Sequence, residues 1–271
     1  MATIKFNERF LFLSPSSHSQ IELRKLNTLE AFASSTLCTE TIEFSCLEKL
    51  YISLESILGL PFVREILSSN AKGKYLDELL DGSLKLIDDC DNVRDLLCRL
   101  RENIRALESA LRRRGGDSSS PEVADYVSFR KSIRQEAKKT MGKLSKQMNG
   151  MSEEWEGIDE SLVRMMKVVR GVHVTALSAV KNVLELLSSS TRRQRKWRMA
   201  WRHTERGEMK NEAERVDEAV EEATVDNARA RKALRVLQDK IESAEISLES
   251  MSRRFLRVRS SLLNIHSHLR H

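Results

Sequence analysis

The fold of this chain is decided by residues 234–269, LRVLQDKIESAEISLESMSRRFLRVRSSLLNIHSHL. Core-type residues recur there at alternating steps of three and four, which places them on one face of an α-helix. The pattern runs for five heptads without a break. It predicts a long helix that packs against other helices through this seam. The seam consists of Leu234, Leu237, Ile241, Ala244, Leu248, Met251, Phe255, Val258, Leu262, Ile265 and Leu269.

A second seam, at residues 76–111, has the same alternation and the same 36-residue extent. At 1.5 Å per residue, each helix is about 54 Å long. Two seams of equal length predict that the two helices pair within one chain, which disfavours a free-standing coiled-coil dimer. The second seam consists of Leu76, Leu79, Ser83, Leu86, Cys90, Val93, Leu97, Leu100, Ile104, Leu107 and Leu111.

Shorter helical patterns fill most of the remaining chain. Weaker patterns predict helices at 21–32 and 41–58 and one or two turns at 62–68. From Ala213 onward, apolar residues run in phase with the terminal seam, so the sequence allows one helix over 208–269, about 93 Å long if unbroken. A third seam consists of Leu162, Met166, Val169, His173, Ala176, Val180, Val183 and Leu187. A helix from Pro121 to about Met148 has as its inner face Val123, Val127, Ile133, Ala137, Met141, Leu144 and Met148.

Composition agrees with an all-helical protein, because the 271 residues include only three prolines and ten glycines. We predict an all-α fold, an elongated antiparallel bundle with long heptad-patterned helices. Residues 1–18 are expected to be a flexible segment, and 19–269 a single domain with a basic connection at 191–207. No apolar run approaches the roughly 20 residues of a membrane span, and the N-terminal run Phe10 to Leu13 is shorter than the h-region of a secretory signal, about 7 to 15 residues. We therefore expect a cytoplasmic protein that is not secreted, with membrane association left open.

The sequence carries no recognisable catalytic, cofactor or metal motif. It lacks G-x-S-x-G, a P-loop, H-E-x-x-H and a glycine fingerprint. The four cysteines form no C-x-x-C pair, so a zinc or redox site is not supported. Asp88, Asp89 and Asp91 are expected to spread around a helix instead of converging on a metal. His173 lies on the third seam, where a structural role is favoured over a pH-sensitive one. The prediction is therefore no enzyme, no cofactor and no metal.

One segment has the chemistry of a contact site. Residues 192–206 hold seven Lys or Arg against one acid, interleaved with Trp197 and Trp201, which are four apart and would share a helical face. Such a segment suits an acidic protein surface, an anionic membrane or, less well, nucleic acid. Alternatively, the eight acids of 208–226 neutralise it. The candidate contact residues are Arg192, Arg193, Arg195, Lys196, Trp197, Arg198, Trp201 and Arg202.

Three stretches together resemble a plant-specific family of uncharacterised helical proteins related to the BYPASS developmental regulators. Residues 74–88, KYLDELLDGSLKLID, resemble its signature W-x-D-E-L-L-D-G-S-L-R-L-L-D, with Tyr75 where the family usually has Trp. Residues 109–117, SALRRRGGD, resemble a family helix end, and 254–265 resemble its closing segment. The similarity runs from about Phe10 to Ser267.

The resemblance implies a role in root and shoot development, with no established biochemical activity and no catalytic residues to carry over. Two functions are compatible with it. The first is a non-enzymatic regulator or scaffold that binds an unidentified protein partner. The second is a peripheral membrane adaptor that docks on anionic lipid through 192–206. The oligomeric state stays open, and the net charge of +6 among 86 charged residues does not by itself imply nucleic acid.

Overall fold

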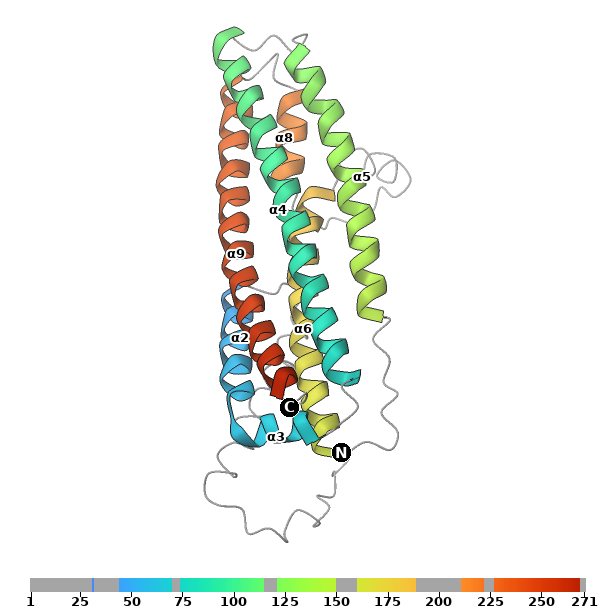
Figure 1. The fold of residues 1–271 in the computed structure, drawn as a ribbon. Coiled ribbons are helices and arrows are strands. Elements are labelled where there is room, and N and C mark those ends of the chain that lie inside the picture. Colours follow the sequence, from blue (N-terminus) through green and yellow to red (C-terminus); the bar gives the residue numbers. More distant parts are fainter. Residues whose placement is uncertain are drawn as a thin grey trace, which may run out of the picture.

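The computed structural model describes Ala31 and residues 44–69, 74–114, 121–149, 160–188, 211–221 and 227–268. This described part is helical and contains no strand, and its long helices pack antiparallel into an elongated bundle, as the sequence predicted (Figure 1). The predicted segment 1–18 and, apart from Ala31, the predicted helix 21–32 lie outside it. Its helices are α2 (Phe44–Leu58), α3 (Pro61–Ser69), α4 (Lys74–Arg114), α5 (Pro121–Asn149), α6 (Glu160–Ser188), α8 (Glu212–Glu221) and α9 (Asn227–His268).

The two long helices α4 and α9 pair along their length in opposite directions, which confirms the prediction from their equal seams. Near the start of α4, Asp77 Oδ1 lies 3.2 Å from His266 Nε2 near the end of α9. Near the end of α4, Glu108 Oε1 lies 3.6 Å from Arg235 Nε. Every α4 seam residue is buried except Leu79, which packs half-buried against the core. Burying both seams against each other supplies the main stabilisation of this pair.

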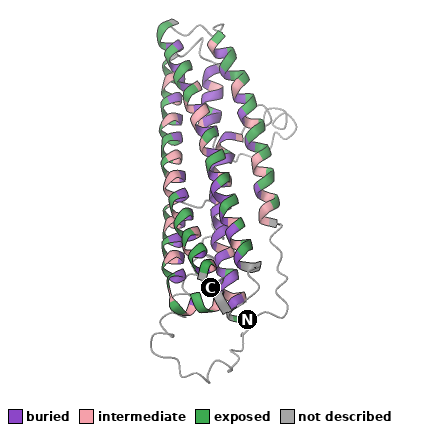
Figure 2. Ribbon diagram, viewed as in Figure 1, coloured by how far each residue is buried: buried purple, intermediate pink, exposed green. Residues whose placement is uncertain are grey.

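The central helix of the bundle is α6, which contacts α2, α3, α4, α5 and α8. All eight residues of its predicted seam are buried. Burial also extends around the helix, as the largely purple ribbon in Figure 2 shows. The sequence therefore predicted one face of α6 correctly but missed the others, which include Met165, Val168, Val172, Leu177 and Leu184.

The stretch from Glu208 to Leu269 is not one continuous helix. Instead, α8 ends at Glu221, α9 begins at Asn227, and the two helices pack side by side. Ala213 and Val216 on α8 and Ala230 on α9 are fully buried. On one long helix these small apolar residues would bury little area. Here they are fully buried, because the chain reverses and α8 packs against α9.

The inner face of α5 also differs from the prediction at one position. Val127, predicted to be inside, is 50% exposed, whereas Tyr126 and Arg130 are buried. Arg130 occupies a core position because it has polar partners on two other helices, described below. None of the described helices is both long enough and apolar enough to cross a lipid bilayer.

Candidate functional site

The basic segment 192–206, with all eight candidate contact residues, lies outside the described residues. The structure does describe the helix ends that flank it, at Ser188 of α6 and Asn211 before α8. Asn211 Nδ2 donates a hydrogen bond to the carbonyl of Leu186, 3.4 Å away. The two ends of the segment are therefore directly connected.

The start of α8 is closed by a reciprocal capping box. The Asn211 side-chain oxygen accepts a hydrogen bond from the backbone N–H of Glu214 at 2.9 Å. In return, the Glu214 carboxylate accepts one from the backbone N–H of Asn211 at 3.3 Å. Two N–H groups that a helix start leaves unpaired are thereby satisfied, so Asn211 both caps α8 and holds α6.

The end of α6 is held by a buried arginine of α5. Arg130 is fully buried, and its Nη1 donates to the carbonyl of Leu187 at 2.7 Å. A helix leaves its last carbonyls unpaired, and a cation beside them is favourable. The same guanidinium lies 3.2 Å from Asp217 Oδ1 on α8, measured from Nε. Arg130 therefore connects α5, α6 and α8.

Two further residues of α5 contact the Asp217 carboxylate. Arg134 of α5 forms an ion pair with Asp217 Oδ2, and the Tyr126 hydroxyl donates to Oδ1 at 3.4 Å. Burial, reinforced by the neighbouring Asp217 charge, raises the pKa of Tyr126 well above its usual range, so the phenol stays a donor. We call Tyr126, Arg130, Arg134, Asn211 and Asp217 the clamp.

The clamp bears on the alternative that the acids of 208–226 neutralise the basic segment. Asp217 belongs to that acidic stretch, but its carboxylate pairs with two arginines of α5. Glu214 belongs to it as well and caps its own helix. At least these two acids are therefore committed to the fold.

The sequence reasoning missed the clamp residue Arg130, although a signal was present. Val123, Tyr126, Arg130, Ile133 and Ala137 alternate in steps of three and four, and all five are buried. An arginine inside such a seam indicates a buried partner for its charge, since an unpaired buried charge is costly. The partner could not be identified from local spacing because Asp217 lies in another helix.

His173 on α6 packs against α4 at Gly82, within the signature segment 74–88. A Cβ atom at Gly82 would lie 3.5 Å from Cε1 of the imidazole, so the glycine leaves the ring close to the α4 backbone. Burial lowers the pKa of His173 to about 4, against a smaller opposing effect of a backbone hydrogen bond with Gly82. His173 is thus a neutral core residue at pH 7, in line with the structural role that the sequence favoured.

Two stretches that carry the family resemblance meet directly. Arg259, in the closing segment, donates from Nη1 to Ser83 Oγ at 3.1 Å and also to the carbonyl of Leu80. The Ser83 hydroxyl in turn donates to the same Leu80 carbonyl at 2.7 Å. The signature segment and the closing segment therefore form one polar contact that fixes the register of α4 against α9.

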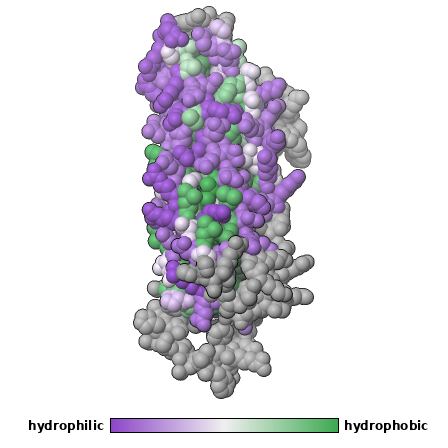
Figure 3. Space-filling view, in the orientation of Figure 1, coloured by the Kyte–Doolittle hydropathy of each residue, from purple (hydrophilic) through white to green (hydrophobic). Residues whose placement is uncertain are grey.

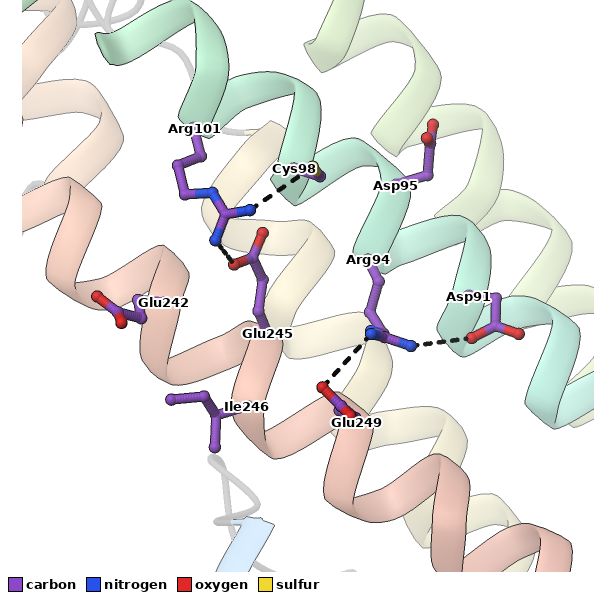
Figure 4. Close-up of a pocket in the computed structure, with 9 residues that line it drawn as sticks. All are labelled: Asp91, Arg94, Asp95, Cys98, Arg101, Glu242, Glu245, Ile246 and Glu249. Atoms are coloured by element: carbon purple, nitrogen blue, oxygen red, sulfur yellow. Dashed lines mark hydrogen bonds and ion pairs between the residues drawn. The ribbon is translucent and has the colours of Figure 1, made fainter.

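A groove of about 520 Å³ lies between α4 and α9 (Figure 4). Arg94 bridges Asp91 at 3.5 Å and Glu249 at 3.6 Å within it. Arg101 pairs with Glu245 at 2.5 Å and lies 3.7 Å from the Cys98 sulfur. We call this site the acidic groove. It is lined by Asp91, Arg94, Asp95, Cys98, Arg101, Glu242, Glu245, Ile246 and Glu249.

Within the part of the chain that the structure describes, no group of three or more His, Cys, Asp or Glu could hold a metal ion. Of the adjacent aspartates on α4, Asp91 pairs with Arg94, and Asp89 is half-buried. Burial, with Asp88 adding to it, raises the pKa of Asp89 to about 6. The cysteines at positions 46, 90 and 98 carry free thiols.

Comparison with known proteins gives one match. No curated protein and no solved structure matches the chain. Residues 43–265 match the family model described as Protein BPS1, a span that includes every described helix except the last residues of α9. The chain therefore belongs to the BPS1 (BYPASS1) family.

Proposed function

We propose that this protein is a non-enzymatic regulator or scaffold in plant development that acts in the cytoplasm through protein–protein contacts. Its family membership suggests a developmental role of the BYPASS type. In its support, the buried polar groups of the clamp pair with one another and hold helix ends together. The observation that carries the proposal is the clamp, because it anchors both ends of the one segment with contact-site chemistry.

Anchoring matters for the energetics of binding. Association costs free energy for every segment that must be ordered. Here the segment 192–206 leaves α6 beside Leu187 and enters α8 at Asn211, and both points are held by hydrogen bonds. Fixed ends lower the entropy that the segment has to lose when it engages a partner. The contacts we propose are its cations and tryptophans, Arg192, Arg193, Arg195, Lys196, Trp197, Arg198, Trp201 and Arg202.

A pull-down from plant tissue tests this proposal. The intact protein is compared with a variant in which the six cations among the proposed contacts become glutamine. A matched control carries the same number of exposed cations changed to glutamine elsewhere. We expect specific co-purifying proteins to be lost from the first variant only, and retention of all of them would contradict the proposal. The control positions are Lys131, Lys138, Lys146, Lys232, Lys240 and Arg257.

A second candidate function is docking of the same segment on an anionic membrane. Its support is the combination of seven cations with Trp197 and Trp201, since each cation near an anionic surface contributes about 1 kcal/mol and indoles favour the headgroup region. Co-sedimentation with phosphatidylserine vesicles at low salt would be expected, and it would be lost in the glutamine variant. No sedimentation of the intact protein would remove this candidate.

A further inference from the structure

The geometry points to a second contact surface, which rests on the proposed action through protein contacts and names the chemistry of the partner. We infer that the acidic groove between α4 and α9 takes a basic amphipathic helix from another protein. This surface is separate from the segment 192–206 and consists entirely of described residues. Three observations carry the inference: the net charge of the groove, its continuation into an apolar strip, and its length.

The groove carries an excess of negative charge. Five carboxylates line it, against two guanidinium groups in the lining, those of Arg94 and Arg101, and a third from Arg253, which pairs with Glu249 at 2.5 Å from outside the lining. Both arginines are already engaged, Arg94 with Asp91 and Glu249 and Arg101 with Glu245. Among the residues drawn in Figure 4, Glu242 has no cationic partner. Asp95 shares Arg99, 3.4 Å away, with Glu136, to which Arg99 is closer at 2.8 Å. A cationic ligand would therefore find uncompensated carboxylates.

The groove continues into an apolar strip toward the end of α9. On α9, Glu242, Glu249, Leu256 and Leu263 recur at steps of seven and so share one stripe. The first two line the groove, and the two leucines are 53% and 44% exposed.

On α4, the matching stripe runs through Leu84, Asp88, Asp91, Asp95 and Cys98 at steps of four and three. Leu84 is exposed, and the last three residues line the groove. The contact of Arg259 with Ser83, next to Leu84, brings Leu84 to the level of the α9 leucines. Figure 3 shows an apolar patch within the largely hydrophilic face on which α4 and α9 lie.

These features fit the helix-in-groove mode of recognition, in which apolar anchors enter a groove and charges flank them. From Glu242 to Leu263 the strip is about 32 Å long, which a partner helix of about 20 residues would span. Ile246, 63% exposed at the acidic end, supplies one further apolar contact. Charge complementarity would set the orientation and speed the encounter. A second copy of this chain fits poorly, because two-fold pairing would set the acidic end against either the acidic end or the apolar end of the other copy, and neither compensates its charge.

Fluorescence anisotropy with the full-length protein tests this surface. The probe is a labelled amphipathic peptide of about 20 residues, with leucine at positions i, i+3, i+4 and i+7 of each repeat and lysine elsewhere. Two matched peptides replace lysine by glutamate or leucine by serine. We expect the leucine–lysine peptide to bind the protein tightly at low salt and more weakly as salt rises, and both matched peptides to bind at least tenfold more weakly. Equal binding of all three would overturn the inference.

Variants locate the binding. We expect Asp95→Lys with Glu242→Lys to weaken binding by about tenfold or more, since each lost ion pair is worth up to roughly fivefold and reversal adds repulsion. Leu256→Ser with Leu263→Ser tests the apolar strip independently, with a loss of similar size. The controls are Asp125→Lys with Glu185→Lys for charge and Ile52→Ser with Val127→Ser for exposed apolar residues. Circular dichroism confirms that each variant keeps its helicity.

Losses of equal size in the control variants, or none in either groove variant, would refute the site. Two other occupants of the groove would give different results, and either result would contradict the binding of a partner helix. Tighter peptide binding after replacement of the cations of 192–206 would show that the chain's own segment fills the groove. A dimer that the groove variants dissociate would show a second copy. If the leucine–lysine peptide does not bind the intact protein while the glutamine variant of 192–206 still loses its co-purifying proteins, the groove is rejected and the proposed function stands.

Discussion

Replacing Arg130 by methionine should loosen the junction of α5, α6 and α8 while keeping most of the side-chain volume. The substitution removes the hydrogen bond to the Leu187 carbonyl and one of the two cations beside Asp217. An unsatisfied buried carbonyl costs about 1–3 kcal/mol, and breaking a buried ion pair costs about 3–5 kcal/mol when no partner is left. Arg134 and Tyr126 still contact Asp217, so the second cost is only partly incurred.

One effect reduces the loss. Nε and Nη2 of Arg130 are buried and have no hydrogen-bond partner among the described residues, and methionine removes both of these donors. The net expectation is a loss of about 2–4 kcal/mol in the free energy of unfolding. For a chain of this size, each kcal/mol lowers the melting temperature by about 2–4 °C. The melting temperature should therefore fall by roughly 4–16 °C.

Urea unfolding followed by circular dichroism measures this loss, and limited trypsin digestion locates it. Because the clamp holds the ends of α6 and α8, cleavage within 189–210 should become faster. A double-mutant cycle with Asp217→Leu isolates the pair: the double variant should lose less than the sum of the single losses by at least about 1 kcal/mol. A loss under about 1 kcal/mol for Arg130→Met, or strict additivity with Asp217→Leu, would refute the role assigned to this arginine.

Three further predictions concern the core. Leu97→Asp and Leu248→Asp should each unfold the bundle, because each places an unpaired charge in a fully buried position; unchanged helicity and melting temperature in either variant would refute the seam assignment. Asp89→Asn should stabilise the protein at pH 7 by about 1 kcal/mol after discounting for its partial exposure. Burial disfavours the ionised carboxylate and so raises the pKa of Asp89 to about 6. The stability gained by Asp89→Asn should therefore shrink between pH 6 and pH 4, and urea titrations at these two pH values check this. The wild-type protein should lose about 2 kcal/mol of unfolding free energy when the pH falls from 7 to 5, and His173→Gln should abolish this loss. The lowered pKa of His173, about 4, means that the unfolded chain takes up the proton first as pH falls, and a wild-type loss that persists in the variant would contradict this.

The long seams were predictable because their information is local. Steps of three and four in 76–111 and 234–269 indicate a buried face whatever the partner is, and their equal extent predicted the partner. Family membership was predictable for a similar reason, since the motifs are contiguous stretches of sequence.

The remaining features depend on contacts between distant parts of the chain. Arg130 is buried because the Leu187 carbonyl accepts its hydrogen bond and Asp217 pairs with its charge, 57 and 87 positions later, and Val127 is displaced from the inner face as a result. The reversal between α8 and α9 escaped prediction because the seams of both helices stay in phase across it. The acidic groove is assembled from two helices about 150 residues apart, so neither stripe indicates a site by itself.

The contact of Arg259 with Ser83 joins positions 176 residues apart, and this separation constrains how the protein is made. Ribosomes add about 5–20 residues per second, so the seam of α4 waits on the order of 10–35 s for its partner to be synthesised. During that time a long row of leucines lies uncovered on the nascent chain, which makes it a natural client for chaperones. Of the described helices, the last to be synthesised is α9, which is also the one that pairs with α4. Premature termination before residue 227 should therefore leave an aggregation-prone fragment instead of a shortened but working protein.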